Sequence, residues 1–353
     1  MLRTLAHIVS LCLRPTLDAL WYGRHLPWTL RWRLLVFQPL SLLGNALITL
    51  PYLFRRPFTV DYIPAGSDQE LRVLVFKHPR RPASEDDIRP GRPLRPLHVD
   101  CHSGGFVGGY PESAAPFCDH LARTTGAVVV SLSYRLAPVH PFPTAIDDVD
   151  AAIAWLQANA ASRFGADPTL MTVSGHSAGG NLALAATQAP ACHAPADTAI
   201  KASVTFYAPV DMRPTPWEKP QSGDLPEWDP LSFMCPLFDS YAAPRKADMG
   251  GSPRMNPTMA ALETLPERML LVVPKADILV KEQLEFVERV KREIEDRRET
   301  KRSIEAMWVE DQFHGYLEVP DIVVSKAKKM EAWDKGVDLI REVHRDNGWK
   351  WNE

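Results

Sequence analysis

A strand, a serine-bearing turn and a helix are expected in succession within residues 170–183, and this segment constrains the fold more than any other. Residues 170–173 are apolar and partly β-branched, which is typical of a buried strand. Gly175, Ser177 and Gly179 then form the pattern Gly-x-Ser-x-Gly. Glycines at both positions remove side chains that would collide in a sharp strand-to-helix turn, and such a turn lifts a serine hydroxyl above a sheet. The segment therefore predicts an α/β protein that presents Ser177 at a strand end.

Upstream, an apolar strand is expected to end in the run His102-Ser103-Gly104-Gly105. Backbone N–H groups placed around a reacting carbonyl oxygen stabilise the negative charge that develops on it. Gly104 and Gly105 can each offer one N–H group, Ala178 can offer a third, and His102 and Ser103 support the loop. We therefore expect an oxyanion hole here, although a flexible glycine-rich turn explains this run equally well when it is taken alone.

A carboxylate and a histidine follow Ser177 in that order, each at the end of an expected strand. Residues 269–273 form a continuous apolar run, and Asp277 comes shortly after them. Residues 304–309 form the next such run, and it leads to His314. Ligand sites of open α/β sheets lie beyond the carboxyl ends of the strands, so these side chains are expected to meet there.

These residue types are the ones that a serine nucleophile needs. Serine is a weak nucleophile at neutral pH, so an imidazole must take its proton during attack and return one to the leaving group. We assign this role to His314, which alone among the eleven histidines falls at an expected strand end after both a candidate serine and a candidate acid. Asp277 is expected to fix the imidazole tautomer and to stabilise the imidazolium. The pattern predicts a hydrolase with a triad of Ser177, Asp277 and His314.

Further motifs extend a resemblance over residues 93–320. Residues 134–138 read Tyr-Arg-Leu-Ala-Pro, residues 140–143 read His-Pro-Phe-Pro, and residues 253–257 read Pro-Arg-Met-Asn-Pro. With the serine turn and the glycine loop, these motifs resemble the hormone-sensitive-lipase-like carboxylesterase branch of the α/β-hydrolase superfamily. The resemblance implies a mostly parallel central sheet flanked by helices, an α-helical lid or cap, the same triad, and ester hydrolysis through an acyl-enzyme.

Three positions depart from the family's pattern. Ser103 replaces the first glycine of the usual His-Gly-Gly-Gly, whereas Gly104 and Gly105 keep the positions that supply the donors. His176 stands where this branch usually has aspartate, and Ile278 stands where a proline usually follows the acid. Because the acid itself is retained, we expect the chemistry to survive. Ser103 and His176 are candidates for an influence on substrate specificity.

Composition agrees with an enzyme of one α/β domain and argues against other classes. At 353 residues, 45% of them hydrophobic and 24% charged, the chain can bury a large core. The net charge of −3 argues against a nucleic-acid-binding surface. The five cysteines show no paired or metal-like spacing, so we expect buried thiols in a reducing compartment, no metal and no cofactor. Cys101, beside the glycine loop, is the one candidate for a reactive thiol.

The N-terminal segment 1–57 is apolar and has two interpretations. Residues 34–54 carry no charge over 21 positions, which is enough to cross a bilayer, and arginines stand on both sides. Pro39 and Pro51 interrupt this run, so a lid or contact with a membrane surface is favoured over a span. Residues 4–13 are too short to span and lack a signal-peptide cleavage pattern. We expect an intracellular protein, cytoplasmic or membrane-associated, that is not secreted.

The remaining residues, 58–353, are expected to form the hydrolase domain. Residues 58–63 and 70–77 alternate apolar and polar side chains around a turn, which predicts an antiparallel hairpin. Residues 145–158 and 281–298 carry helix-start signals or apolar residues at helical spacing, so both are expected to be helices.

An insertion at about 209–261 lacks clean periodicity but is rich in large apolar side chains. These are Trp217, Trp228, Phe233, Met234, Leu237, Phe238 and Tyr241. An insertion this apolar between two strands is expected to be a cap over the site, and such a cap shapes a pocket that prefers hydrophobic substrates.

Three functions remain open at this point. The leading hypothesis is a cofactor-free serine carboxylesterase whose partner is a hydrophobic small-molecule ester, such as a natural product, with membrane-surface contact through residues 34–54. An amidase such as an aryl-formamidase, or a biosynthetic acyl-transferring hydrolase, would use the same triad, because fold and triad do not fix the substrate. A catalytically silent binding protein is disfavoured, because all three triad residues are present.

Overall fold

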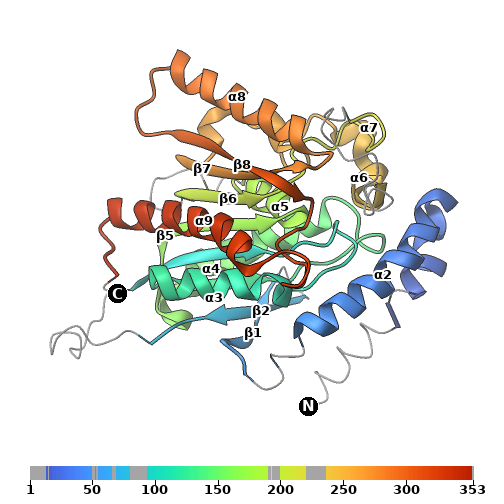
Figure 1. Ribbon diagram of the computed structural model, residues 1–353, viewed down its shortest axis with the longest axis horizontal. Coiled ribbons are helices and arrows are strands. Elements are labelled where there is room, and N and C mark those ends of the chain that lie inside the picture. The colour runs from blue at the N-terminus through green and yellow to red at the C-terminus, as the bar shows by residue number, and fades with distance from the viewer. Residues whose placement is uncertain are drawn as a thin grey trace.

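A central sheet of eight strands organises the fold, and helices lie on both of its faces (Figure 1). The structure is a computed structural model, and it describes residues 13–14, 16–49, 52, 55–65, 69–79, 94–189, 192, 199–219 and 236–351. The expected fold class, a mostly parallel central sheet flanked by helices, is confirmed.

The described strands are β1 (Phe58–Pro64), β2 (Glu70–Phe76), β3 (Arg95–Cys101), β4 (Val128–Leu132), β5 (Ala166–His176), β6 (Ala202–Phe206), β7 (Arg268–Ala276) and β8 (Ser303–Phe313). Their order across the sheet is β1-β2-β4-β3-β5-β6-β7-β8. The predicted hairpin is confirmed, since β1 pairs antiparallel with β2, and β2 also pairs antiparallel with β4. All other neighbours are parallel, so the strands from β4 to β8 end at the same edge.

The described α-helices are α2 (Trp28–Thr49), α3 (Ala115–Thr125), α4 (Thr144–Phe164), α5 (Ala178–Ala186), α6 (Asp239–Ala242), α7 (Lys246–Met249), α8 (Val280–Asp296) and α9 (Lys326–Asp346). Short 3-10 helices are η1 (Tyr22–His25), η4 (Pro111–Ala114), η7 (Ala243–Arg245), η8 (Pro257–Met259) and η9 (Leu262–Thr264). Both predicted helices are confirmed: α4 contains residues 145–158 and continues beyond them, and α8 covers most of 281–298.

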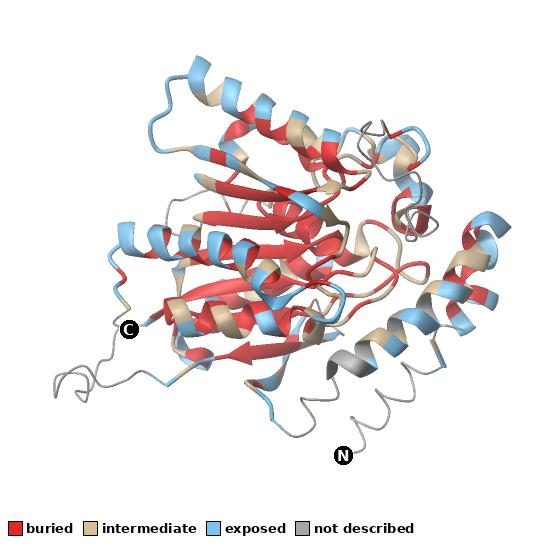
Figure 2. Ribbon diagram, viewed as in Figure 1, coloured by how far each residue is buried: buried red, intermediate tan, exposed pale blue. Residues whose placement is uncertain are grey.

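Two layers of helices cover the sheet. Helices α4, α5 and α8 pack on one face, and α3 and α9 pack on the other. Leu270 and Val272 of β7 belong to the apolar cluster beneath α9, whereas Leu271 and Val273 belong to the cluster beneath α8. Successive side chains of a strand point to opposite faces, so a strand covered on both sides is apolar throughout. Figure 2 shows the buried sheet and the exposed outer sides of the helices.

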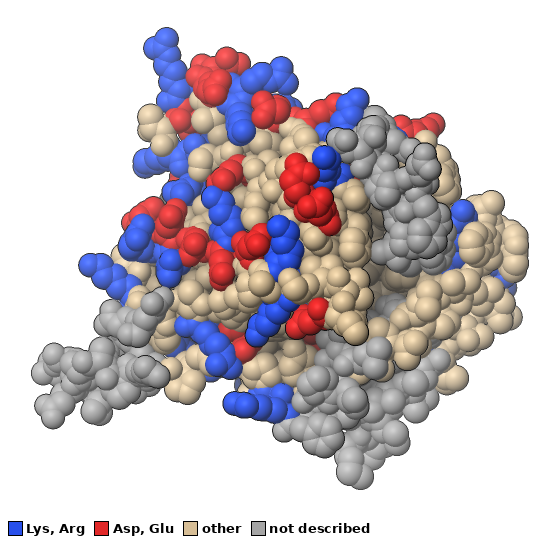
Figure 3. All heavy atoms as spheres, in the orientation of Figure 1, with Lys and Arg blue, Asp and Glu red and all other residues tan. Residues whose placement is uncertain are grey.

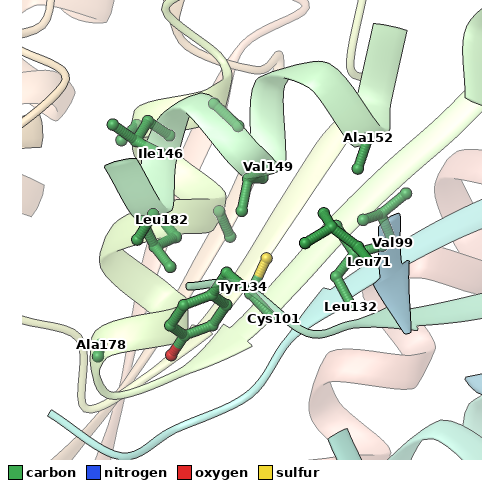
Figure 4. Packing of buried hydrophobic residues seen from close by; sticks show 14 of the residues in the cluster. Leu71, Val99, Cys101, Leu132, Tyr134, Ile146, Val149, Ala152, Ala178 and Leu182 are labelled. Atoms are coloured by element: carbon green, nitrogen blue, oxygen red, sulfur yellow. The ribbon is translucent and has the colours of Figure 1, made fainter. Parts of the chain in front are cut away.

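Helices α4 and α5 pack tightly over β3 (Figure 4). Ile146 and Val149 of α4, Leu182 of α5, and Val99 and Cys101 of β3 are each at most 1% exposed. Because close-packed apolar contacts tolerate little displacement, this packing holds the first turn of α5 at a fixed place on the sheet.

The N-terminal segment contains a long helix that packs against the domain through one side. This helix, α2, starts before the apolar run 34–54, whose positions 50–51 and 53–54 lie outside the described residues. Leu30 and Leu34 on α2 are buried. No helix within the described ranges is both long enough and apolar enough to cross a membrane.

Part of the insertion 209–261 lies outside the described residues, including Trp228, Phe233 and Met234. Its described parts contain the short helices α6 and α7, which lie at the side of the molecule that α2 also occupies (Figure 1).

Candidate active site

Four polar side chains directly follow four neighbouring parallel strands. Ser177 comes after β5, Tyr207 after β6, Asp277 after β7 and His314 after β8. Because these strands are parallel neighbours, the four residues lie along one edge of the sheet. Strand β3 pairs in parallel with β5 and ends at the same edge, so the loop that begins at His102 leaves the sheet beside Ser177.

The turn at Ser177 has the sharp geometry that its sequence predicts. Ser177 has a φ of +50°, which is rare for a residue other than glycine. Its N–H donates to the carbonyl of Phe206 at 2.8 Å. A Cβ atom on Gly175 would overlap the carbonyl of Gly179, and one on Gly179 would overlap the carbonyl of Cys101. Both glycines are therefore required, and the turn brings the start of α5 against the end of β3.

The side chains of the predicted triad form one hydrogen-bonded line. Ser177 Oγ lies 2.8 Å from His314 Nε2, and His314 Nδ1 lies 2.9 Å from Asp277 Oδ2. When Nδ1 carries the proton and donates it to the carboxylate, Nε2 is the acceptor for the serine hydroxyl. This geometry can transfer the serine proton to the imidazole.

Burial and one backbone donor hold the Asp277 carboxylate in place. The Asp277 side chain is fully buried, and its Oδ1 accepts a hydrogen bond from the Leu279 N–H at 2.9 Å. The other oxygen, Oδ2, is left for His314, whose side chain is 30% exposed. The Asp277 carboxylate is therefore fixed in position, while the His314 imidazole that it contacts remains accessible to a small molecule.

The loop after β3 and the start of α5 carry N–H groups that no acceptor among the described residues engages. Gly104 has a φ of +125°, and a Cβ atom there would overlap the carbonyl of Gly108. Within the described ranges, the N–H groups of Gly104, Gly105 and Ala178 donate to no protein acceptor. Ala178 opens α5, and the free N–H groups of a helix N-terminus favour negative charge. Their role as an oxyanion hole stays a prediction that this arrangement fits.

His102 supports the loop from behind. Its Nδ1–H donates to the carbonyl of Ser103 at 2.6 Å, and its ring stacks on Tyr134 at a centroid distance of 4.2 Å. The Tyr134 hydroxyl donates to the carbonyl of His102 at 2.8 Å. Burial lowers the pKa of His102 to about 4, so this residue is neutral near pH 7 and acts through geometry.

Two residues that the sequence did not single out face the same centre. The Tyr207 ring meets the His314 ring edge-on, at a centroid distance of 5.1 Å. The Glu318 carboxyl interacts with the hydroxyl of Ser103. Burial raises the pKa of Glu318 to about 7, and the Ser103 hydroxyl and the nearby His314 oppose this rise. No motif marks Glu318, and only the turn after β8 brings it to the residue that replaces the family's glycine.

Two further candidates lie in the core rather than in the site. His176 is 2% exposed and stacks on Phe206 at 4.4 Å, and burial lowers its pKa to about 3, so its neutral ring is a packing element. Cys101 is buried, and burial raises the pKa of its thiol well above the ordinary value. Because the thiolate is the reactive form, the expectation of a reactive Cys101 is wrong.

The other described cysteines, Cys118 and Cys192, are also buried free thiols, whereas Cys12 and Cys235 lie outside the described residues. In the part of the chain that the structure describes, no group of three or more His, Cys, Asp or Glu side chains could hold a metal ion.

The insertion contacts both the loop beside Ser177 and the N-terminal segment. Tyr241 of the insertion stacks on Phe106, which follows the glycine loop, at a centroid distance of 4.1 Å. The Arg33 guanidinium of α2 lies 5.5 Å from the ring centre of Trp217 in the insertion. The insertion therefore packs against the glycine loop and also contacts α2.

Comparisons with known proteins identify the fold family. A family model described as the alpha/beta hydrolase fold matches residues 98–318. The carboxylic ester hydrolase LipN of Mycobacterium tuberculosis is 40% identical over 111 residues, which are 30% of this chain and 30% of LipN. The ethyl acetate hydrolase of Pseudomonas putida is 30% identical over 200 residues, which are 56% of this chain and 60% of that protein.

Solved structures are also similar to this chain, and one of them is similar over most of its length. It is EstE1, a thermostable carboxylesterase cloned from a metagenomic library, with a TM-score of 0.66, 25% identity, and coverage of 87% of this chain and 97% of that chain. By contrast, the alignments with the curated relatives named above span less than two thirds of their length.

Proposed function

The chain belongs to the hormone-sensitive-lipase-like branch of the α/β-hydrolase fold family, and from this premise we propose that it is a serine carboxylesterase acting on a hydrophobic ester. The observation that carries the proposal is the line from Ser177 Oγ through His314 to Asp277, with contacts of 2.8 and 2.9 Å. A serine, a base and a buried acid in this geometry form an activated nucleophile.

In the first step, Ser177 Oγ attacks the ester carbonyl carbon while His314 Nε2 takes the hydroxyl proton. Asp277 stabilises the imidazolium, and the N–H groups of Gly104, Gly105 and Ala178 stabilise the negative oxygen. The tetrahedral intermediate then breaks its bond to the alcohol oxygen, which leaves with the proton from the imidazolium. An acyl group remains on the serine oxygen.

In the second step, water adds to the acyl carbonyl while His314 takes a proton from that water. Collapse of the second intermediate breaks the bond to Ser177 Oγ, and the imidazolium returns the proton to this oxygen. The products are the carboxylic acid and the free serine. No group other than the chain's own residues and water is needed for this sequence.

We assign the role of a cap to the insertion 209–261 together with the inner side of the N-terminal segment 1–57. The contact between Tyr241 and Phe106 supports this assignment, because it places an aromatic side chain of the insertion against the loop of the oxyanion donors. Small-molecule sites are lined mostly by apolar side chains, so hydrophobic acyl or alcohol groups are the substrates that we propose.

The test compares an ester with its amide on three forms of the full-length protein. Ser177→Ala should lower kcat/KM for p-nitrophenyl butyrate by about 10⁴-fold or more, because the nucleophile is removed. Ser162→Ala is the matched control, since this exposed hydroxyl donates to the Asn159 carbonyl of its own helix, away from the triad.

The wild type should hydrolyse the ester faster than p-nitroanilide of the same acyl chain. Faster cleavage of the anilide would favour the amidase hypothesis over the esterase. Equal activity of Ser177→Ala and the wild type would refute both.

A further inference from the structure

Exposed apolar side chains are concentrated at the N-terminal end of the described chain. Of the seventeen large hydrophobic residues that are exposed among the described residues, nine lie between positions 13 and 43. Leu13, Leu17 and Leu20 are each about half exposed and stand at the spacing of one helix side. Scattered exposed leucines need no explanation, but a cluster of this size marks an interaction surface.

Helix α2 has apolar side chains on two different sides. Leu30 and Leu34 are buried against the domain, whereas Val36, Leu40 and Leu43 are 40%, 52% and 61% exposed. With 3.6 residues per turn, the exposed stripe is turned by roughly 130° from the buried one. A helix that only covered its own domain would place polar side chains on its outer side. The outer stripe therefore indicates a partner outside the domain.

The same segment is strongly basic. Between Asp18 and Asp61 the chain has no acidic residue but contains Arg24, Arg31, Arg33, Arg55 and Arg56. The Arg24 guanidinium lies 5.1 Å from the Trp21 ring centre, and that of Arg31 lies 5.7 Å from the Trp28 ring centre. In Figure 3, the surface over α2 at the right shows no acidic side chain.

Charge decides which partner fits this surface. A second copy of the chain docking through the same face would bring this basic segment against itself, and like charges across an interface oppose association. A bilayer with anionic headgroups offers apolar chains to the leucines and negative charge to the arginines. Tryptophan rings with arginines at the border of an apolar stripe are typical of segments at the headgroup level.

We propose that the outer side of the N-terminal segment, formed by residues 13–43, binds the surface of an anionic membrane with α2 lying along it. The inner side of α2 keeps its contacts with the domain, so the protein binds without a spanning helix. The proposal stands on exposure, spacing and charge alone, and it does not depend on the esterase activity.

The test measures binding of the full-length protein to sedimenting vesicles of phosphatidylcholine, with and without phosphatidylserine. We expect binding that requires phosphatidylserine, a blue shift of tryptophan fluorescence, and weaker binding at high salt, because salt screens exposed charges. The variant Arg24→Gln should lower the apparent partition coefficient by about fivefold, since each basic residue near an anionic surface contributes to binding.

The apolar stripe is tested by Leu40→Glu/Leu43→Glu, which should abolish vesicle binding. Its matched control is Ile322→Glu/Val323→Glu, an exchange of side chains that are 94% and 61% exposed outside this segment, and it should bind like the wild type. Circular dichroism shows which variants fold. If a variant does not fold, the salt dependence of vesicle binding by the wild type still tests the proposal.

Three results would overturn the proposal. The first is equal binding of the wild type to vesicles with and without phosphatidylserine. The second is a loss of binding in the control variant equal to that in Leu40→Glu/Leu43→Glu. The third is a wild-type protein that does not bind vesicles but forms a dimer, which Leu40→Glu/Leu43→Glu dissociates. The last result would assign the surface to a second copy of the chain.

Discussion

Ser177 adopts a backbone conformation that few residues tolerate, and neighbouring contacts hold it there. A φ of +50° in a residue with a Cβ costs of the order of 1–3 kcal/mol. The bond from its N–H to Phe206 and the fit of α5 on β3 compensate for this cost. The serine oxygen is therefore placed before any substrate arrives, which lowers the entropic part of the barrier.

The Asp277 carboxylate selects the tautomer of His314, and Asp277→Asn tests this role. An amide in this position can donate to Nδ1 and leave the proton on Nε2, where it blocks acceptance from Ser177. We expect kcat to fall by about 10⁴-fold while the thermal midpoint stays close to that of the wild type. Activity within tenfold of the wild type would mean that another carboxylate orients the imidazole.

Glu318 should make the folded protein less stable as the pH rises. Burial raises its pKa from 4.5 to about 7, so between these values the folded state holds a proton that the unfolded chain has lost. Stability therefore falls with rising pH in this window, by up to about 3 kcal/mol from this group. In Glu318→Gln the loss disappears, so the variant gains stability over the wild type between pH 5 and 8 in urea denaturation. If the difference in unfolding free energy between Glu318→Gln and the wild type does not change with pH, this account of Glu318 is contradicted.

At the scale of elements, the site depends on how closely α5 approaches β3. Gly179 lies at this junction, and Gly179→Ala would force its Cβ atom into the carbonyl of Cys101. We expect this variant to lose at least about 2 kcal/mol of stability and most of its activity, because the serine turn and the glycine loop move apart. Gly251→Ala is the matched control, since a Cβ atom there meets nothing within 4 Å. Similar losses of stability and activity in both variants would show that the site does not depend on the close approach of α5 to β3.

Strand ends explain why much of the site could be predicted from sequence. Asp277 and His314 were found because each follows a continuous apolar run, and such runs become parallel strands that end at one edge. Their order after Ser177 then matched the triad. The local sequence pattern is sufficient to predict a site residue wherever the preceding strand determines that residue's position.

Residues placed by tertiary contacts could not be predicted in this way. Glu318 reaches Ser103 only through the turn after β8, and no spacing in the chain connects the two. His176 is the last residue of β5, directly before Ser177, but its side chain lies in the core, because successive side chains of a strand alternate between faces. The outer side of α2 also needed the structure, since its buried and exposed leucines look alike in sequence.

At the scale of the whole molecule, a buried chain of hydrogen bonds joins α9 to the middle of the sheet. His98 contacts the Thr172 and Ser174 hydroxyls at 2.8 Å each, and the Ser174 hydroxyl donates to Asp100 at 2.7 Å. His344 approaches Thr172 at the far end. These hydrogen bonds can all run in one direction, towards Asp100, only if Nδ1 of His98 accepts from the Thr172 hydroxyl. Nδ1 can accept only when the His98 ring is neutral, which agrees with burial lowering the pKa of His98 to about 3.

Acid should weaken the fold through these buried histidines. Burial lowers the pKa of His344 from 6.5 to about 3, so between these values the unfolded chain binds a proton that the folded state does not. Stability therefore falls as the pH falls through this window, by about 1.4 kcal/mol per pH unit for this group. His344→Gln should remove that slope, so its stability relative to the wild type rises from pH 6 to pH 4.5 in urea titrations. If the difference in unfolding free energy between His344→Gln and the wild type is the same at pH 6 and pH 4.5, His344 is protonated in the folded state.

The most direct test of the central claim is covalent trapping of the serine. A fluorophosphonate reacts only with a serine that an adjacent base has activated. Peptide mass mapping of the treated full-length protein should find one adduct, on Ser177, and its rate of formation should fall by about a thousandfold or more in His314→Ala, because the base is lost. An adduct on another serine, or equal labelling of Ser177 in the wild type and His314→Ala, would contradict the account.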